Sequence, residues 1–138
     1  MEHPTVFPTL QYDDAGAAID FLTRAFGAER HAVYADENGM IRHAELRFGN
    51  GIVMLGTARD DAPATSGRGG GIYVAVADPD AHCARSRGAG AEIVRDVNDT
   101  DYGSREYGAR DPEGNAWHFG TYQPFVFEHD AAAASATA

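Results

Sequence analysis

The chain contains no lysine, and its 11 basic residues, all arginine, are outnumbered by 21 acidic ones. Its formal net charge is −10. This balance argues against a nucleic-acid partner, because phosphate contacts require clustered basic side chains. The acidity either keeps the protein in solution or favours a cationic ligand.

Long apolar runs are also missing. No stretch approaches the roughly 20 residues that cross a bilayer, and residues 1–4 lack a signal-peptide pattern. The single cysteine, Cys83, has no partner for an internal disulfide, which suits a reducing compartment. We expect it to be a small buried residue on a helix. The sequence therefore predicts a cytoplasmic protein with no membrane partner.

Several catalytic patterns are missing as well. No Gly-x-Ser-x-Gly motif occurs, and the glycines of residues 67–71 lack the Lys and Ser/Thr of a phosphate-binding loop. Among the carboxylates, we expect only Glu45 to face a cavity, so hydrolysis by paired carboxylates lacks its second member.

The chain repeats itself with an offset of 63 to 64 residues. Residues 27–29, Gly-Ala-Glu, recur as residues 90–92, and Leu-Gly-Thr at 55–57 recurs as Phe-Gly-Thr at 119–121. Two copies of one supersecondary unit are therefore expected, each too small to form a good core alone.

Each copy opens with an apolar strand, at residues 5–12 and 71–78, and continues through a helix into three further strands. We expect turns at residues 49–51 and 113–115 to join the last two strands of each copy. The predicted fold class is α+β. Two βαβββ modules form a curled mixed sheet around a shared cavity, with the helices on the outer face.

The expected domain organisation is a single domain over residues 1–124. Module 1 covers about 5–58 and module 2 about 71–124, and a linker rich in Gly, Ala, Ser and Asp joins them at 59–70. Residues 125–138 form a tail that we expect to be partly disordered, since it lacks a core-forming pattern.

Capping residues place the two helices. Either Asp13 or Asp14 caps the first, which ends at Gly27, and Asp78-Pro79 begins the second, which ends before Gly88. Strand alternation then sorts the side chains by face. We expect Trp117 to face the helices, and His43 and Glu45 to face the hollow.

Two stretches resemble a known family. They are residues 102–105, Tyr-Gly-Ser-Arg, and residues 111–122, which begin Asp-Pro-Glu-Gly-Asn. Together with the repeated module, they resemble the vicinal oxygen chelate superfamily over residues 5 to about 124. That superfamily includes glyoxalase I, extradiol dioxygenases, fosfomycin-modifying enzymes and bleomycin-resistance binding proteins. The chain is most similar to the last, metal-free branch.

The resemblance implies a metal site only where four strand positions carry His, Glu or Gln. The matching positions here are Phe7, Met54, Gly71 and His118. Only His118 has a metal-binding side chain, and shifting the register by one residue brings in no other ligand. We therefore expect no metal and no cofactor. An unfamiliar metal site built from His43, Glu45 and His118 is the remaining alternative.

The resemblance favours a metal-independent small-molecule binding protein that sequesters a bulky planar or cationic antibiotic, for resistance or self-protection. The alternative is a metal-dependent enzyme, similar to glyoxalase or the dioxygenases, with an atypical site. The expected ligand-binding residues are Phe7, His43, Glu45, Met54, Tyr73, Arg105, Tyr107 and His118.

Four of these residues have structural alternatives. Arg105 either binds a ligand anion or pairs with Glu45, and Glu45 and His43 either face a ligand or pair with Arg47 or another arginine. Tyr107 either stacks on a flat ligand or lies at the rim of the cavity. Because family members commonly form dimers, the resemblance also implies a homodimer, which the apolar residues 124–127 are placed to contact.

Overall fold

The computed structural model describes residues 4–67 and 69–125, so most of the predicted tail, residues 126–138, lies outside the described part. The elements in chain order are β1 (Thr9–Tyr12), α1 (Ala15–Phe26), β2 (Glu29–Ala35), β3 (Ile41–Phe48), β4 (Gly51–Thr57), β5 (Ile72–Ala75), α2 (Pro79–Gly88), β6 (Glu92–Asp99), β7 (Arg105–Arg110) and β8 (Ala116–Gly120). Neither described helix is long and apolar enough to cross a bilayer.

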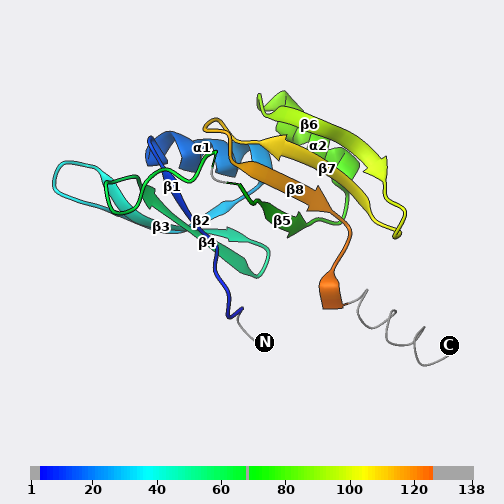
Figure 1. Cartoon of the computed structure of the whole chain (residues 1–138), viewed down its shortest axis with the longest axis horizontal. Helices are drawn as coiled ribbons and strands as arrows, with labels where there is room; N and C mark the ends of the chain where they lie inside the picture. Colours follow the sequence, from blue (N-terminus) through cyan, green and yellow to red (C-terminus); the bar gives the residue numbers. More distant parts are fainter. Residues whose placement is uncertain (1–3, 68, 126–138) are drawn as a thin grey trace.

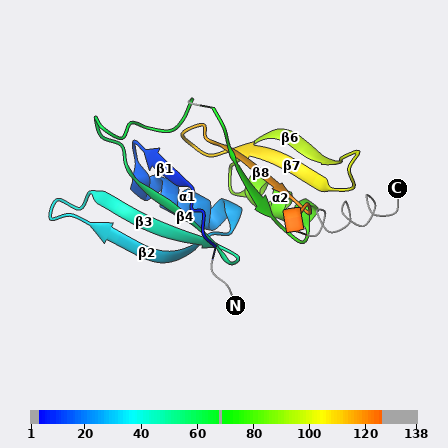
Figure 2. The same cartoon turned by 60° about the horizontal axis from the view of Figure 1, so that its bottom comes forward.

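The strands form two four-stranded mixed sheets, ordered β1-β4-β3-β2 and β5-β8-β7-β6. In each sheet the first and last strands of the module pair in parallel, and the other pairs are antiparallel. The α+β prediction of two βαβββ modules is confirmed. Figures 1 and 2 show the sheets side by side, with the chain crossing between β4 and β5. Since β1 and β5 are edge strands, the seam between the modules runs along them.

The first strand of each module is shorter than predicted. β1 begins at Thr9 instead of residue 5, because Pro8 has no N–H to donate to a sheet. β5 ends at Ala75, three residues before Asp78 caps α2 by accepting the Ala81 N–H at 3.0 Å.

Helix α1 is tied to module 2 at its first turn. Asp14 is the N-cap, accepting the Ala17 N–H at 3.0 Å, and Gly27 ends the helix with a φ of 84°. The Glu113 carboxylate accepts the N–H groups of Asp13 and Asp14 at 2.7 and 2.8 Å. Acidic side chains thus satisfy the free N–H groups before and within the first turn of α1.

The two modules share one hydrophobic core. Phe26, at the end of α1, packs against Trp117 and Phe119 of β8, with ring centroids 5.4 and 4.9 Å apart. All three rings are buried. Trp117 therefore faces the helices as strand alternation predicts, and the end of α1 contacts the sheet of module 2 as well as its own.

Candidate functional site

A buried carboxylate fixes the loop between β7 and β8. Asp111 accepts the Trp117 indole N–H at 3.0 Å, the Asn115 backbone N–H at 3.0 Å and the Tyr12 hydroxyl at 2.6 Å. Burial, and then the Asp111 charge, raise the pKa of Tyr12 well above its usual range, so the hydroxyl stays a donor. The conspicuous Asp-Pro-Glu-Gly-Asn stretch therefore links the modules.

The open face of module 1, the side away from the helices, carries the predicted polar residues. Ala44 and Leu46 are buried against the helices, so His43 and Glu45 lie on the opposite face with Met54, which is the strand partner of Glu45. His43 Nε2 lies 2.9 Å from Glu45 Oε2. These two residues thus pair with each other.

Arg47 is not the partner of that pair. Its guanidinium lies 2.9 Å from His31 Nδ1 and 3.6 Å from Glu29. Tyr34 of β2 stacks on His43, with ring centroids 6.0 Å apart and the planes inclined by 22°. The open face of module 1 is therefore a row of exposed and partly buried polar and aromatic side chains.

The open face of module 2 holds Tyr73 and His118, which are strand partners on β5 and β8. Gly71 also adjoins His118, because a Cβ there would lie 3.4 Å from His118 Cδ2. Two predicted residues and one familial metal position are thus brought together. His43 and Glu45 lie on the other sheet, and no hydrogen bond or ion pair in the described residues joins them to this group.

A carboxylate that sequence reasoning missed, Glu106, lies on this same face. The residue is only 7% exposed. Oε1 accepts the Tyr102 hydroxyl at 2.9 Å and lies 3.7 Å from the Arg95 guanidinium. Tyr73 donates its hydroxyl to the Tyr122 carbonyl at 2.8 Å, and the Tyr122 ring contacts those of Tyr73 and Tyr102. We call Tyr73, Tyr102, Tyr122 and Glu106 the tyrosine–carboxylate cluster.

The placement of Tyr107 on the open face is wrong. The side chain is fully buried on the helix side of β7, stacked on Phe119 with ring centroids 5.1 Å apart. Its hydroxyl hydrogen-bonds His82 Nδ1 and lies 2.8 Å from Ser86 Oγ. Burial raises the pKa of Tyr107 to about 12. The physical reason is that side chains alternate between the two faces of a strand, and in β7 the odd-numbered residues, including Tyr107, face α2.

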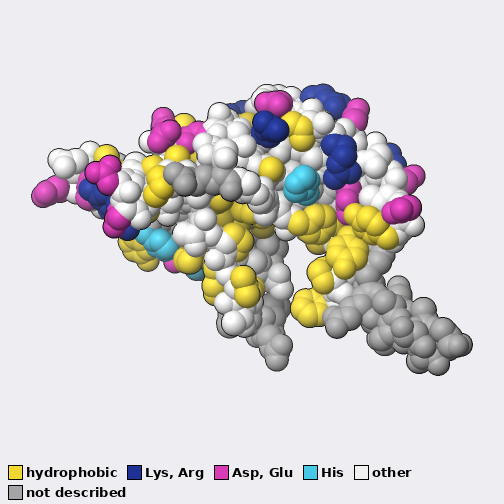
Figure 3. Space-filling model, viewed as in Figure 1, with side chains coloured by type: hydrophobic (Ala, Val, Ile, Leu, Met, Phe, Trp, Pro, Cys, Tyr) yellow, Lys and Arg dark blue, Asp and Glu magenta, His cyan; other side chains and the backbone are white. Residues whose placement is uncertain are grey.

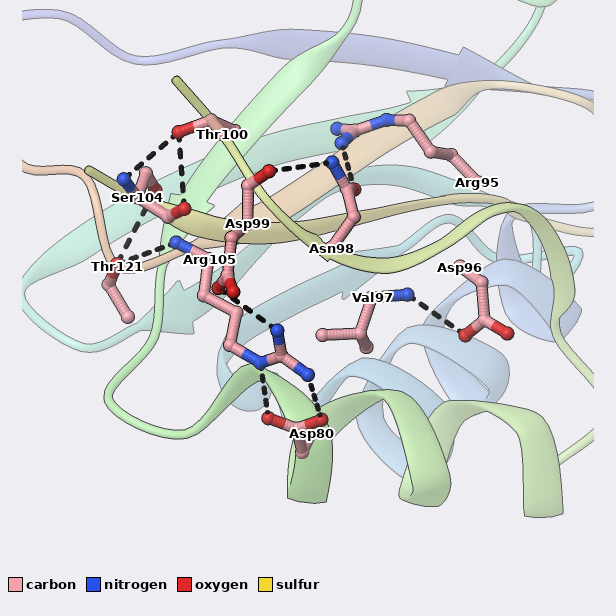
Figure 4. Close-up of polar contacts among 10 residues, drawn as sticks. All are labelled: Asp80, Arg95, Asp96, Val97, Asn98, Asp99, Thr100, Ser104, Arg105 and Thr121. Carbon is pink, nitrogen blue, oxygen red and sulfur yellow. Dashed lines mark hydrogen bonds and ion pairs between the residues drawn. The ribbon is translucent and has the colours of Figure 1, made fainter. Parts of the chain in front are cut away.

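Arg105 is committed to two carboxylates other than Glu45. Its guanidinium donates to both Asp80 oxygens at 2.7 and 3.0 Å and to Asp99 at 3.0 Å (Figure 4). Its hydrogen bonds to these carboxylates raise the pKa of Arg105 above its usual range, and the bonds to Asp80 have the larger effect. The expected pairing with Glu45 is wrong, because the side chain points to α2 and β6.

Phe7 lies before β1, in the segment that leads into module 1, and is partly exposed. Its neighbours Val6 and Pro8 line a cavity of about 390 Å³ between the modules. The other lining residues are Phe48, Gly49, Asn50, Gly51, Ile52, Val53, Ile72, Tyr73, Val74, Ala75 and Gln123. This seam cavity is bounded mainly by apolar side chains, and Tyr73 joins it to the tyrosine–carboxylate cluster.

A second cavity, of about 530 Å³, lies at the other end of the seam. Its lining residues are Pro8, Thr9 and Leu10 at the start of β1, then Thr65, Gly67, Gly69, Gly70, Gly71, Ile72, Arg110, Gly114, Asn115 and Ala116. None of the eight sequence-predicted ligand residues lines it. Tyr73 is the one member of that set that lines either of these two cavities.

The residues present do not fit the metal implied by the resemblance. Met54 and Gly71 offer no imidazole or carboxylate, Phe7 lies outside the strand, and His118 is a single ligand. No group of three His, Cys, Asp or Glu side chains in residues 4–67 and 69–125 is placed to hold a metal ion. His43, Glu45 and His118 are among the side chains of that part of the chain, so the structure does not support the alternative metal site.

Comparison with known proteins matches residues 3–119 to the Glyoxalase/Bleomycin resistance protein/Dioxygenase superfamily. The solved structure of TioX from Micromonospora sp. ML1 is 38% identical, with a TM-score of 0.70, over 85% of this chain and 94% of TioX.

Two more distant structures share the fold. TnmS3, an antibiotic binding protein from Streptomyces sp. CB03234, is 22% identical, with a TM-score of 0.68, over 86% of this chain and 96% of TnmS3. A glyoxalase I mutant from Zea mays is 20% identical, with a TM-score of 0.70, over 84% of this chain and 44% of that protein. One fold thus accompanies both binding proteins and enzymes.

Proposed function

We propose that this chain, which belongs to the Glyoxalase/Bleomycin resistance protein/Dioxygenase superfamily, binds a bulky planar or cationic organic molecule without a metal ion. The role we propose is sequestration of an antibiotic, for resistance or self-protection. The observation that carries the proposal is the donor set, in which His118 is the only metal-binding side chain at the four familial positions.

The seam cavity supports this proposal. Its volume of about 390 Å³ lies within the usual range of small-molecule sites, and most of the side chains that line it are apolar, although polar groups also contribute to its walls. Apolar side chains of this kind can pack against a flat aromatic body. We propose that Phe7 and Tyr73 flank the ligand, and that Met54, His43, Glu45 and His118 meet it on the open faces. Arg105 and Tyr107 are left out for the reasons given above.

The similar structures are compatible with this function, but they do not distinguish a binding protein from an enzyme. TnmS3 is named as an antibiotic binding protein and the maize protein as glyoxalase I, and at 22% and 20% identity both share the fold alone. The choice between binding and catalysis therefore rests on the side chains of this chain. A metal-dependent reaction needs ligands that Met54 and Gly71 do not supply.

We also propose that the protein works as a homodimer. Val6 and Phe125, near the two ends of the described chain, are 83% and 84% exposed, and β2 and β6 are the outer edges of the two sheets. A second copy would cover such apolar side chains and edges. Sedimentation at micromolar concentration should give twice the chain mass of 14.7 kDa. A monomer mass would contradict the dimer and leave the binding proposal standing.

Calorimetric titration with acridine, a planar and neutral probe above pH 7, tests the binding function. Saturable binding is expected, and Ala75→Trp should weaken it at least about tenfold, because the indole would fill the seam cavity. Ala84→Trp is the matched control, since Ala84 is an exposed alanine of α2 that lines neither cavity. Absence of acridine binding, or an Ala75→Trp protein that binds like wild type, would contradict the proposal.

A further inference from the structure

We propose that the tyrosine–carboxylate cluster is a binding site for an organic cation that carries a substituted ammonium group. The inference rests on the proposed function and sharpens it, because Tyr73 belongs both to the cluster and to the wall of the seam cavity. A ligand whose flat body fills the cavity would place its charged group here. In Figure 3, hydrophobic side chains gather over the ends of β5 and β8, beside acidic, basic and histidine side chains.

The three rings are arranged steeply to one another. Tyr122 contacts Tyr73 at a centroid distance of 6.3 Å with the planes inclined by 73°, and Tyr102 at 5.9 Å with an angle of 87°. Both contacts are therefore of the edge-to-face type, and the planes of neighbouring rings are nearly perpendicular. A cation within about 6 Å of an aromatic ring face is attracted by the ring quadrupole.

Glu106 supplies the negative charge. Its carboxylate is almost completely buried, yet the one arginine contact that it makes within residues 4–67 and 69–125, with Arg95 Nη2, is at 3.7 Å and too long for a hydrogen bond. Arg95 Nη1 is directed instead to Asn98 at 2.8 Å. A buried carboxylate that is paired so loosely gains from a further positive group.

Gly120 makes the convergence possible. A Cβ at this position would lie 2.5 Å from Glu106 Cγ and 2.8 Å from the Tyr73 hydroxyl oxygen. The side chains of Glu106 and Tyr73 therefore both pass over β8 at Gly120, where a larger residue would collide with them. The glycine belongs to the repeated Gly-Thr motif, and here it builds a site that the first module does not have.

The chemistry of the cluster selects a cation over an anion or a neutral group. An anion would meet the Glu106 charge and the negative ring faces, and the chain as a whole carries a net charge of −10. Burial and Glu106 raise the pKa of Tyr73 to about 12, so its hydroxyl is protonated at neutral pH. The carboxylate is then the charged member of the cluster that a ligand cation meets.

Titration with choline and its neutral isostere 3,3-dimethylbutan-1-ol, followed by NMR, tests the inference directly. Choline should bind at least about tenfold more tightly than the alcohol. Glu106→Gln, which keeps size and the acceptor for Tyr102, should remove most of this preference. Glu37→Gln, which neutralises an exposed carboxylate of module 1 outside the proposed binding site, should leave choline affinity within about twofold.

A second pair of variants tests the rings. Tyr102→Leu should weaken choline binding several-fold, and Tyr34→Leu should not, although the two tyrosines are similarly exposed at 53% and 60%. Arg95→Gln should tighten binding, because it removes the competing guanidinium. Equal affinity for choline and the alcohol, or unchanged choline binding in Glu106→Gln, would overturn the inference.

Acridine separates this inference from the proposed function. Neutral acridine should bind Glu106→Gln as it binds wild type, whereas N-methylacridinium should lose affinity. If acridine fails to bind while choline binding depends on Glu106, the cation site stands and the proposed function fails. The reverse pattern leaves the proposed function and removes the cation site.

Discussion

The two modules share one strand order but hold their helices by different means. Helix α1 buries seven residues, all apolar, and its Phe26 reaches into module 2. Helix α2 buries only Pro79, Cys83 and Ser86. His82 compensates by donating from Nε2 to the Phe26 carbonyl at 2.9 Å. Duplication of a topology therefore does not duplicate the interactions that stabilise it.

The open faces differ in the same way. Module 1 presents the His43–Glu45 pair, partly buried and close to solvent. At the position offset by 63 residues from His43, module 2 presents Glu106, which is buried beneath tyrosines. One face is a solvated polar surface and the other is built to hold a charge away from water.

The largest expected effect comes from removing the ring that joins the modules. Phe26→Ala should lower the free energy of unfolding by about 3–5 kcal/mol, because it opens a cavity against Trp117 and Phe119. Urea titration measures this loss. Cys83→Ala, at the buried cysteine of α2, should cost about 1 kcal/mol. Equal losses would show that both helices are held by apolar burial.

A smaller loss is expected from Tyr107→Phe, which removes only the hydroxyl shared by His82 and Ser86. Leaving these buried groups without that partner should cost about 1–3 kcal/mol of stability. Acridine affinity should not change, since the side chain lies on the helix side of β7. A variant of normal stability but weakened acridine binding would return Tyr107 to the ligand site.

Acid should act on module 2 through His82. Burial lowers the pKa of His82, outweighing its bond to the Phe26 carbonyl, and Arg85 lowers it further. Above about pH 6.5 the residue is neutral in both the folded and unfolded chains, so it contributes no pH dependence. As pH falls from there toward the lower folded pKa, the unfolded chain binds the proton preferentially and stability decreases.

Urea midpoints measured between pH 7 and pH 5 should therefore fall for wild type and fall less for His82→Gln. The glutamine retains a side-chain N–H donor but does not titrate. Parallel profiles for the two proteins would show that His82 does not sense the acid.

The smallest effect is expected at the open face of module 1. Glu45→Gln should change the free energy of unfolding by less than about 1 kcal/mol, because the His43–Glu45 pair remains accessible to water. Thermal unfolding at neutral pH measures it. A loss comparable to that of Tyr107→Phe would contradict the contrast between the two faces.

Much of the fold follows from the sequence because the repeat, the caps and the glycines act locally. Gly27 and Gly90, offset by 63 residues, both adopt a positive φ, and β2 and β6 begin two residues after them. The lengths of β1 and β5 were harder to predict. Pro8 and the N-cap Asp78 restrict these strands, while the apolar pattern extends beyond both limits.

The site was less predictable, because an error of one residue in assigning the faces of a strand places every side chain on the wrong side of the sheet. Adding the offset of 63 to Ala44, which faces the helices, gives Tyr107, and adding it to His43 gives Glu106. The repeat therefore contained the signal that would have placed both residues correctly. No comparable signal pairs Arg105 with Asp80, since that contact depends on how α2 packs on its sheet.

The account depends most on the claim that ligand binding needs no metal ion. Protein purified without chelators should contain well under one equivalent of Zn, Ni, Mn or Fe per chain, and its acridine affinity should be the same with and without excess EDTA. A stoichiometric metal whose removal abolishes acridine binding would contradict the account.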